Sequence, residues 1–153
     1  MSPSPRTLPF CLALIVLLAF GGPVGAQTVY LSEFLAENQT NTKVDEDGDH
    51  SDWLEIWNSG ATTVSLNGWY LTDNAGDLRK WQFPVTTPAV SLAANARLLV
   101  FASNKDRRLA ITKLHTNFKL DAKGDYLALI ARDGTTVIQQ FPADYPTDRK
   151  SVV

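Results

Sequence analysis

Short runs of alternating hydrophobic and polar residues dominate the chain from Gln27 onward, and no segment repeats hydrophobic residues at intervals of three and four. A period of two is typical of half-buried β-strands, whereas a spacing of three and four would indicate helices. Turn residues separate the runs, and 153 residues are expected to form one domain. The pattern therefore predicts an all-β sandwich or barrel. The expected strands are residues 29–37, 52–58, 64–71, 80–83, 97–102, 116–120, 126–131 and 136–141.

Several of these runs carry more detailed expectations. Residues 97–102 (RLLVFA) and 126–131 (YLALIA) are hydrophobic on both faces, which is typical of strands in the middle of a sheet. Between the last two strands, Asp133-Gly134 favours a tight hairpin turn that matches strand twist. Residues 104–113 are the least regular stretch, and a helical turn is the element that fits there.

The N-terminus has a different character from the rest of the chain. Arg6 is the only charged residue before Glu33, and residues 10–20 (FCLALIVLLAF) form an unbroken hydrophobic run. This run is shorter than the roughly 20 residues that span a bilayer, and small residues ending at Ala26 follow it. We therefore predict a signal peptide over residues 1–26, with an uncleaved membrane anchor as the alternative. Residues 27–145 are then the domain and 146–153 a tail or the start of a linker.

Cleavage near Ala26 predicts a secreted, periplasmic or cell-surface protein with no transmembrane helix in its mature form. The mature chain would contain no cysteine, because Cys11 is the only one. Loss of Arg6 leaves 13 basic against 16 acidic residues, a net charge of −3. Nucleic-acid binding depends on clustered lysine and arginine, so it is not expected of this composition.

Four segments together resemble a lamin tail domain. They include the pattern W-x-E-x-x-N and the pattern G-W-x-L-x-D, which are fairly specific when they occur together. The resemblance implies an immunoglobulin-like β-sandwich of the bacterial, exported branch of the family, whose members occur in large secreted or cell-surface proteins. It implies no catalytic residues. The segments are residues 29–34 (VYLSEF), 52–60 (DWLEIWNSG), 66–73 (LNGWYLTD) and 80–84 (KWQFP).

One acidic stretch has the composition of a cation site. Asp45, Asp47, Asp49 and Asp52 lie at alternate or nearly alternate positions around a glycine. Calcium binds about 6–8 oxygen ligands, and closely spaced carboxylates supply them. The spacing is not that of an EF-hand, which needs a glycine at its sixth position and a glutamate at its twelfth. A solvated acidic loop is the ordinary interpretation of such a stretch, a calcium site at these four aspartates is the alternative prediction, and no other cofactor is expected.

Signals for catalysis are weak. His50 and His115 are the only histidines, too few for zinc without a cysteine, and His115 is expected at the surface or in a turn. The sequence contains no G-x-S-x-G motif and no phosphate-binding glycine loop. Residues 105–108 (KDRR) are expected to be a solvated loop, with contact to an acidic polymer as the alternative. Trp57 is the best candidate for stacking on a sugar, although a tryptophan is more often buried in the core.

These observations predict an exported, non-catalytic interaction or adhesion module. Its partner would be a protein or a polysaccharide that the sequence does not identify. A carbohydrate- or polymer-binding domain is the first alternative, and it requires exposed aromatic side chains on one sheet face. The ancillary domain of an exported hydrolase or nuclease is the second alternative, and it requires a catalytic domain encoded after Val153.

Overall fold

The computed structural model describes residues 28–39, 43–87, 89–124, 126–141 and 150–151. None of these residues is helical, so no helix in the described part is long and hydrophobic enough to cross a membrane. The predicted signal peptide, residues 1–26, lies outside the described residues. The strands are β1 (Val29–Leu35), β2 (Asp52–Asn58), β3 (Val64–Ser65), β4 (Tyr70–Thr72), β5 (Trp81–Gln82), β6 (Ser91–Leu92), β7 (Arg97–Ala102), β8 (Arg107–Arg108), β9 (Leu114–His115), β10 (Leu127–Ile130), β11 (Val137–Phe141) and β12 (Lys150–Ser151).

The larger sheet has the strand order β12-β1-β2-β7-β9-β8. All its pairings are antiparallel except that of β7 with β9, which is parallel. Leu54 and Ile56 of β2 face the core, as the alternation predicts, and β7 lies inside the sheet as expected from its two hydrophobic faces. A bulge at Ser32 interrupts β1, and the side-chain amide of Gln139 bonds there to both the N–H and the C=O of Leu31. The bulged edge is thus tied to the opposite sheet.

The second sheet has the order β11-β10-β4-β5, with β10 inside it as predicted. The turn between β10 and β11 confirms the expected hairpin. Gly134 adopts a φ of 71°, and the Asp133 carboxylate accepts hydrogen bonds from the N–H groups of Thr135 and Thr136. A short third sheet pairs β3 with β6.

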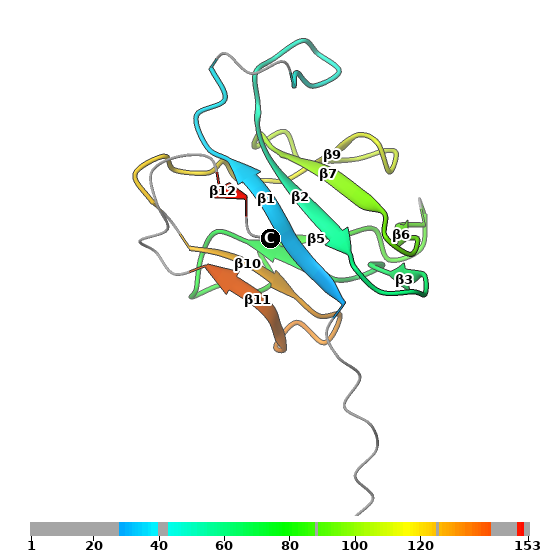
Figure 1. The fold of residues 1–153 in the computed structure, drawn as a ribbon. Helices are drawn as coiled ribbons and strands as arrows, with labels where there is room; N and C mark the ends of the chain where they lie inside the picture. Colours follow the sequence, from blue (N-terminus) through cyan, green and yellow to red (C-terminus); the bar gives the residue numbers. More distant parts are fainter. Residues whose placement is uncertain (1–27, 40–42, 88, 125, 142–149, 152–153) are drawn as a thin grey trace, which may run out of the picture.

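The two main sheets pack face to face, as Figure 1 shows with β1, β2 and β7 in one layer and β5, β10 and β11 in the other. Both layers contribute to one hydrophobic core, which confirms the predicted sandwich. Trp81 and Phe83 meet edge to face in it, with ring centroids 4.8 Å apart. The largest fully buried side chains are Trp53, Trp81, Phe34, Phe83, Leu31, Leu54, Ile56, Leu66, Leu71, Leu114, Leu127 and Leu129.

Trp53 is buried outside this core, on the outer face of the larger sheet. It packs with Leu35 and Phe101 in a second, smaller cluster, and Leu99 lies against them. The ammonium of Lys43 lies 3.9 Å from the centre of the Trp53 ring and covers it from the solvent side. The outer face is therefore partly hydrophobic rather than fully polar.

Some elements differ from the sequence-based expectation. The strand expected over residues 64–71 is two strands, because Gly68 turns the chain with a φ of 76°. The helical turn expected within residues 104–113 is wrong for the start of that stretch: Asn104 and Asp106 have positive φ, and β8 follows them. A turn does close from Ala110 to Lys113. Strand β12 pairs with β1 and falls within the segment interpreted as a tail.

Candidate functional site

The acidic residues that the sequence singles out lie in one loop between β1 and β2, here called the acidic loop (residues 43–51). Asp45 organises it: one carboxylate oxygen accepts the N–H groups of Asp47 and Asp49 at 3.0 and 3.1 Å, and the other accepts the Ser51 hydroxyl at 2.7 Å. Aspartate favours such turns because its short side chain reaches the backbone two residues on. Gly48 provides the left-handed conformation, with a φ of 83°.

The ammonium of Lys105 lies among three aspartates of the acidic loop. Its Nζ is 2.6 Å from Asp45, 2.7 Å from Asp47 and 2.9 Å from Asp49. Lys105 comes from the connection between β7 and β8, so these ion pairs join two loops that are about 60 residues apart in sequence. The positive charge offsets the repulsion that three neighbouring carboxylates would otherwise produce.

These contacts shift the pKa values of both partners. Burial alone would raise the pKa of Asp45, but hydrogen bonds from Lys105, Ser51 and two backbone N–H groups outweigh it and hold that pKa far below the usual range. Burial alone would lower the pKa of Lys105, yet its hydrogen bonds to the three carboxylates raise it above the usual range. Both groups are therefore charged at neutral pH.

Asp52, the fourth predicted calcium ligand, lies apart from the other three. It begins β2, where its carboxylate accepts the backbone N–H of Asn38 at 3.2 Å. Burial raises the pKa of Asp52, and the backbone hydrogen bonds offset this only in part. Asp52 thus supports the end of β1 rather than the carboxylate cluster.

The remaining three aspartates match the chemistry of a hard cation, because one carboxylate oxygen from each lies within 4.8 Å of the others. The ammonium of Lys105 already bonds to all three. Calcium binding stays a prediction, and it requires Lys105 to give up these contacts.

A second network ties the acidic loop to β9. His115 Nδ1 lies 2.7 Å from the Ser103 hydroxyl, and His115 Nε2 lies 2.9 Å from a carboxylate oxygen of Glu46. The imidazole is fully buried and stacks on Phe101 at 5.2 Å. The expectation that His115 lies at the surface is therefore wrong. It fails because β9 is enclosed between β7 and β8, with the acidic loop above its ring nitrogen.

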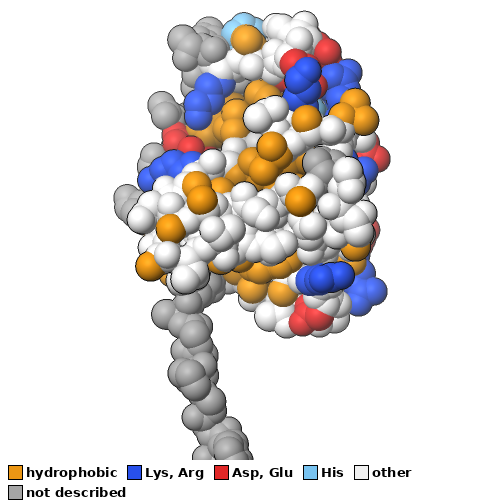
Figure 2. Space-filling model, turned by 90° about the vertical axis from the view of Figure 1, so that its right-hand side faces the viewer, with side chains coloured by type: hydrophobic (Ala, Val, Ile, Leu, Met, Phe, Trp, Pro, Cys, Tyr) orange, Lys and Arg blue, Asp and Glu red, His pale blue; other side chains and the backbone are white. Residues whose placement is uncertain are grey.

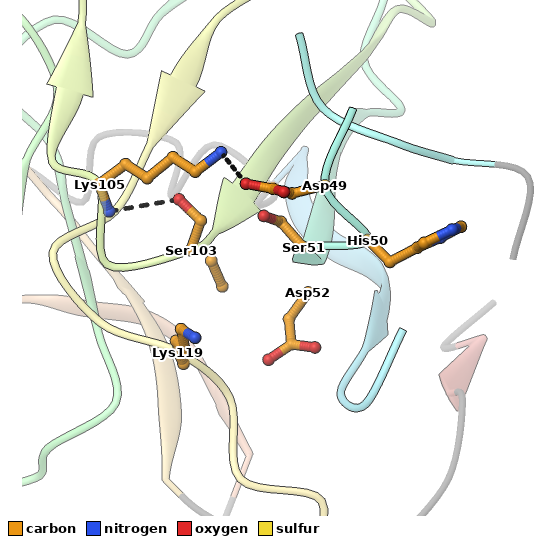
Figure 3. A pocket seen from close by; sticks show the side chains of 8 residues that line it. Asp49, His50, Ser51, Asp52, Ser103, Lys105 and Lys119 are labelled. Carbon is orange, nitrogen blue, oxygen red and sulfur yellow. Dashed lines mark hydrogen bonds and ion pairs between the residues drawn. The ribbon is translucent and has the colours of Figure 1, made fainter. Parts of the chain in front are cut away.

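A pocket of about 200 Å³ opens beside these networks. Figure 3 shows Ser103 and Lys105 on one side of it and Asp52 and Lys119 below, whereas the exposed His50 points away from them. Ser103 and Lys119 are directly opposite each other in a β-bridge. The pocket is thus lined by hydroxyl, carboxylate and ammonium groups.

The basic run at residues 105–108 does not form a single-sign patch. Arg107 bonds to Glu46 at 3.2 Å and to Asp47 at 2.8 Å. Arg108 pairs with Asp106 at 2.7 Å, and its guanidinium lies 5.0 Å from the ring of the buried Trp81. On the face in Figure 2, blue and red side chains lie next to each other with hydrophobic side chains between the charged groups. This pairing does not favour binding of an acidic polymer at the run.

Three large side chains that carry polar groups lie in a row across the outer face of the larger sheet. Tyr30, Trp57 and Arg97 are partners in register on β1, β2 and β7. The Trp57 ring is partly exposed; it lies 6.5 Å from the Tyr30 ring and 4.9 Å from the Arg97 guanidinium. The guanidinium is held by Glu55 at 2.7 Å. In this row the Trp57 ring, the predicted stacking residue, is accessible to a ligand.

Arg97 also borders a shallow groove of about 310 Å³. Leu98, Leu99, Ile111 and Thr112 line the rest of it. Leu109, close by in the chain, is 83% exposed. Leu109 is the most exposed of the large hydrophobic side chains in the part of the chain that the structure describes.

Comparison with protein families matches residues 25–142 to the Lamin Tail Domain. The chain belongs to the lamin tail domain family. No curated protein matches this lamin tail domain.

The structure assigns physical roles to the residues that carry the family pattern. Asn58 is fully buried, and its amide donates to the carbonyls of Thr62, Leu92 and Ala93 while its Oδ1 accepts from Gly60. The side chain therefore fastens the turn after β2 to the strand β6. In the second pattern, Asp73 pairs with Lys80 at 2.6 Å. These positions act in the lamin tail domain as determinants of the fold.

Sequence reasoning found three of the acidic residues that cluster but missed their partners. Nothing in the local pattern connects Lys105 with Asp45, or His115 with Glu46, because each pair is 60 or more residues apart. The lamin tail domain brings these groups together because β2, which follows the acidic loop, pairs with β7, and β7 pairs in turn with β9.

Proposed function

We propose that this lamin tail domain is an exported, non-catalytic interaction or adhesion module that binds a protein partner through the outer face of its larger sheet. The observation that carries the proposal is the Tyr30–Trp57–Arg97 row, whose Arg97 also lines the groove with Ile111. The exposed Leu109 lies two residues before Ile111 in the chain. Aromatic residues and arginine are enriched where proteins bind one another.

Several features of the row suit a binding site. Residues on strands are held in place by the sheet, so the row costs little conformational entropy to order on binding. Arg97 is already positioned by Glu55 and by the face of Trp57, and its side chain is 48% exposed. The groove beside it offers Leu99 and Ile111 for hydrophobic contact.

A carbohydrate ligand is the second candidate, because the partly exposed rings of Tyr30 and Trp57 are of the kind that stack on sugars. The position of the Arg97 guanidinium over the Trp57 ring argues against it, since a sugar would have to displace that contact.

A binding comparison tests the proposal. The purified protein, its Trp57→Ala and Leu109→Ser variants, and the matched control Lys123→Ala are applied to a glycan array and to an array of extracellular proteins. Saturable binding to a protein that is lost in both variants and retained in the control would support the proposal. Binding confined to glycans and lost in Trp57→Ala would favour the second candidate. Binding unaffected by either substitution would exclude this face.

Export has its own test. Sequencing the N-terminus of protein recovered from the medium, the periplasm or the cell surface is expected to give Gln27 as the first residue. Recovery only from the cytoplasm with Met1 or Ser2 retained would contradict export.

A further inference from the structure

Three side chains from separate parts of the fold form a connected series, and one of them, Ser103, lines the pocket. Ser103 follows β7, His115 ends β9, and Glu46 lies in the acidic loop. The serine hydroxyl is 2.7 Å from one imidazole nitrogen, and the glutamate is 2.9 Å from the other. A hydroxyl, a base and a group that orients the base, each within hydrogen-bonding distance of the next, are the arrangement that activates a serine.

The hydrogen bonds around the series fix the direction of each donor in the neutral imidazole. The Arg107 guanidinium lies 3.2 Å from Glu46, which marks Glu46 as a carboxylate, and a carboxylate can only accept hydrogen bonds. The proton of the neutral ring therefore lies on Nε2, and Nδ1 is the acceptor. The Ser103 hydroxyl donates to Nδ1 while its oxygen accepts the N–H of Lys105 at 3.3 Å.

We propose that Ser103 is an activated nucleophile that is acylated by small carboxylic esters, with His115 as its base and Glu46 as the positioning residue. The hydroxyl oxygen forms a bond to the ester carbonyl carbon, and its proton passes to His115 Nδ1. The bond from the carbonyl carbon to the leaving oxygen breaks, and that oxygen takes the proton from Nδ1. The products are an acyl ester of Ser103 and a free alcohol or phenol.

The surroundings of Ser103 determine which esters fit. The residue is 7% exposed and lines the pocket of about 200 Å³, which admits a small acyl group rather than a long chain. Lys119 lies opposite Ser103 in the β-bridge and also lines the pocket, and we assign its ammonium to the carbonyl oxygen of an ester bound there. A positive charge there stabilises the oxygen as it becomes negative during attack.

This chemistry goes beyond the proposed binding role and lies away from the Tyr30–Trp57–Arg97 row. The proposal concerns one acylation per molecule and assigns no residue to hydrolysis of the product, so it is compatible with a module that does not turn over a substrate. Failure of one proposal leaves the other unaffected, because the two surfaces are tested with different probes and different variants.

The test uses p-nitrophenyl acetate as the probe. The purified protein is incubated with the ester while release of p-nitrophenolate is followed, and the modified residue is located by intact mass and peptide mass spectrometry. We expect one acetyl group per molecule, located on Ser103. Ser103→Ala is expected to abolish this label, whereas the matched control Ser91→Ala, an exposed serine on β6, is expected to be labelled like the parent protein.

Two further variants separate a chemical role from a structural one. Ser103→Thr keeps a hydroxyl beside the buried ring and is expected to be labelled more slowly. Glu46→Gln is expected to slow acetylation by about 100-fold, within the range of a positioned base, and to change its pH profile, while circular dichroism shows the fold retained. Absence of a label on Ser103 in the folded protein would overturn the proposal. So would acetylation confined to lysines and unchanged in Ser103→Ala.

Discussion

Replacing Lys105 with methionine isolates the charge at the centre of the acidic loop. Methionine keeps an unbranched side chain but removes the ammonium that bonds to three aspartates at 2.6–2.9 Å. The side chain of Asp45 is fully buried and that of Lys105 is 19% exposed, whereas Asp47 and Asp49 are 40% and 65% exposed. The loss of stability is therefore expected to arise mainly at Asp45, whose charge would remain buried without its partner.

The size of this loss follows from the burial of the pair. Removing one partner of a fully buried ion pair costs about 3–5 kcal/mol. The partial exposure of Lys105 reduces the expected cost to about 2 kcal/mol of unfolding free energy. For a domain of this length that corresponds to a fall in the thermal midpoint of roughly 8 °C. Thermal melts followed by circular dichroism measure it, with the exposed Lys123→Met as the control, expected to stay within about 0.5 kcal/mol.

The same variant tests the predicted calcium site. Without the ammonium, Asp45, Asp47 and Asp49 repel one another, so calcium is expected to raise the melting midpoint of Lys105→Met more than that of the parent protein. Binding to the folded state alone adds about 2.7 kcal/mol at a hundred times Kd. Asp47→Ala in the Lys105→Met background is expected to remove the shift. An unchanged midpoint in Lys105→Met would refute the reasoning about the ion pair, and no calcium response in either protein would show the calcium prediction to be wrong.

Other consequences of the structure can be measured by denaturation. Because the pKa of Asp45 lies below the ordinary 3.8, its stabilising contribution is complete well above that value and is lost as the pH falls below it. The thermal midpoint should therefore drop as the pH falls below about 4, and less steeply in Lys105→Met, whereas parallel curves would contradict this. Asn58→Ala should cost about 2–4 kcal/mol in urea denaturation, since three carbonyls lose a buried donor; a loss under about 1 kcal/mol would speak against that role. Gly134→Ala should lower the free energy of unfolding more than Gly48→Ala does. Both glycines have positive φ, but only at Gly134 does the added methyl group meet the Arg79 side chain. Equal losses would refute the steric argument.

The strand pattern was predictable because it depends on neighbouring residues. Alternation placed Leu54 and Ile56 in the core, and hydrophobic runs on both faces placed β7 and β10 inside their sheets. The two-residue strands β6, β8 and β9 were not predicted, because segments so short have no periodicity and form only where another strand is in register with them. The helical turn was expected where positive φ at Asn104 prevents one.

For the candidate site, the sequence identified carboxylates but not the charges that meet them. The composition of residues 45–52 indicated an acidic turn, and the turn is present. Only the folded sheet decided that Lys105 would occupy its centre and that Asp52 would bond instead to the backbone of Asn38. Similarly, the isolated histidines indicated nothing about a buried His115 between Ser103 and Glu46.

The sequence by itself determined the class of fold, the family and most strand positions, since these depend on short-range alternation, turn residues and a few patterned side chains. The tertiary structure decided which charges are paired, which serine has a base beside it, and which aromatic residues face outward. Those outcomes depend on contacts between residues far apart in the chain, and such contacts are set by strand register and sheet packing rather than by any local sequence pattern.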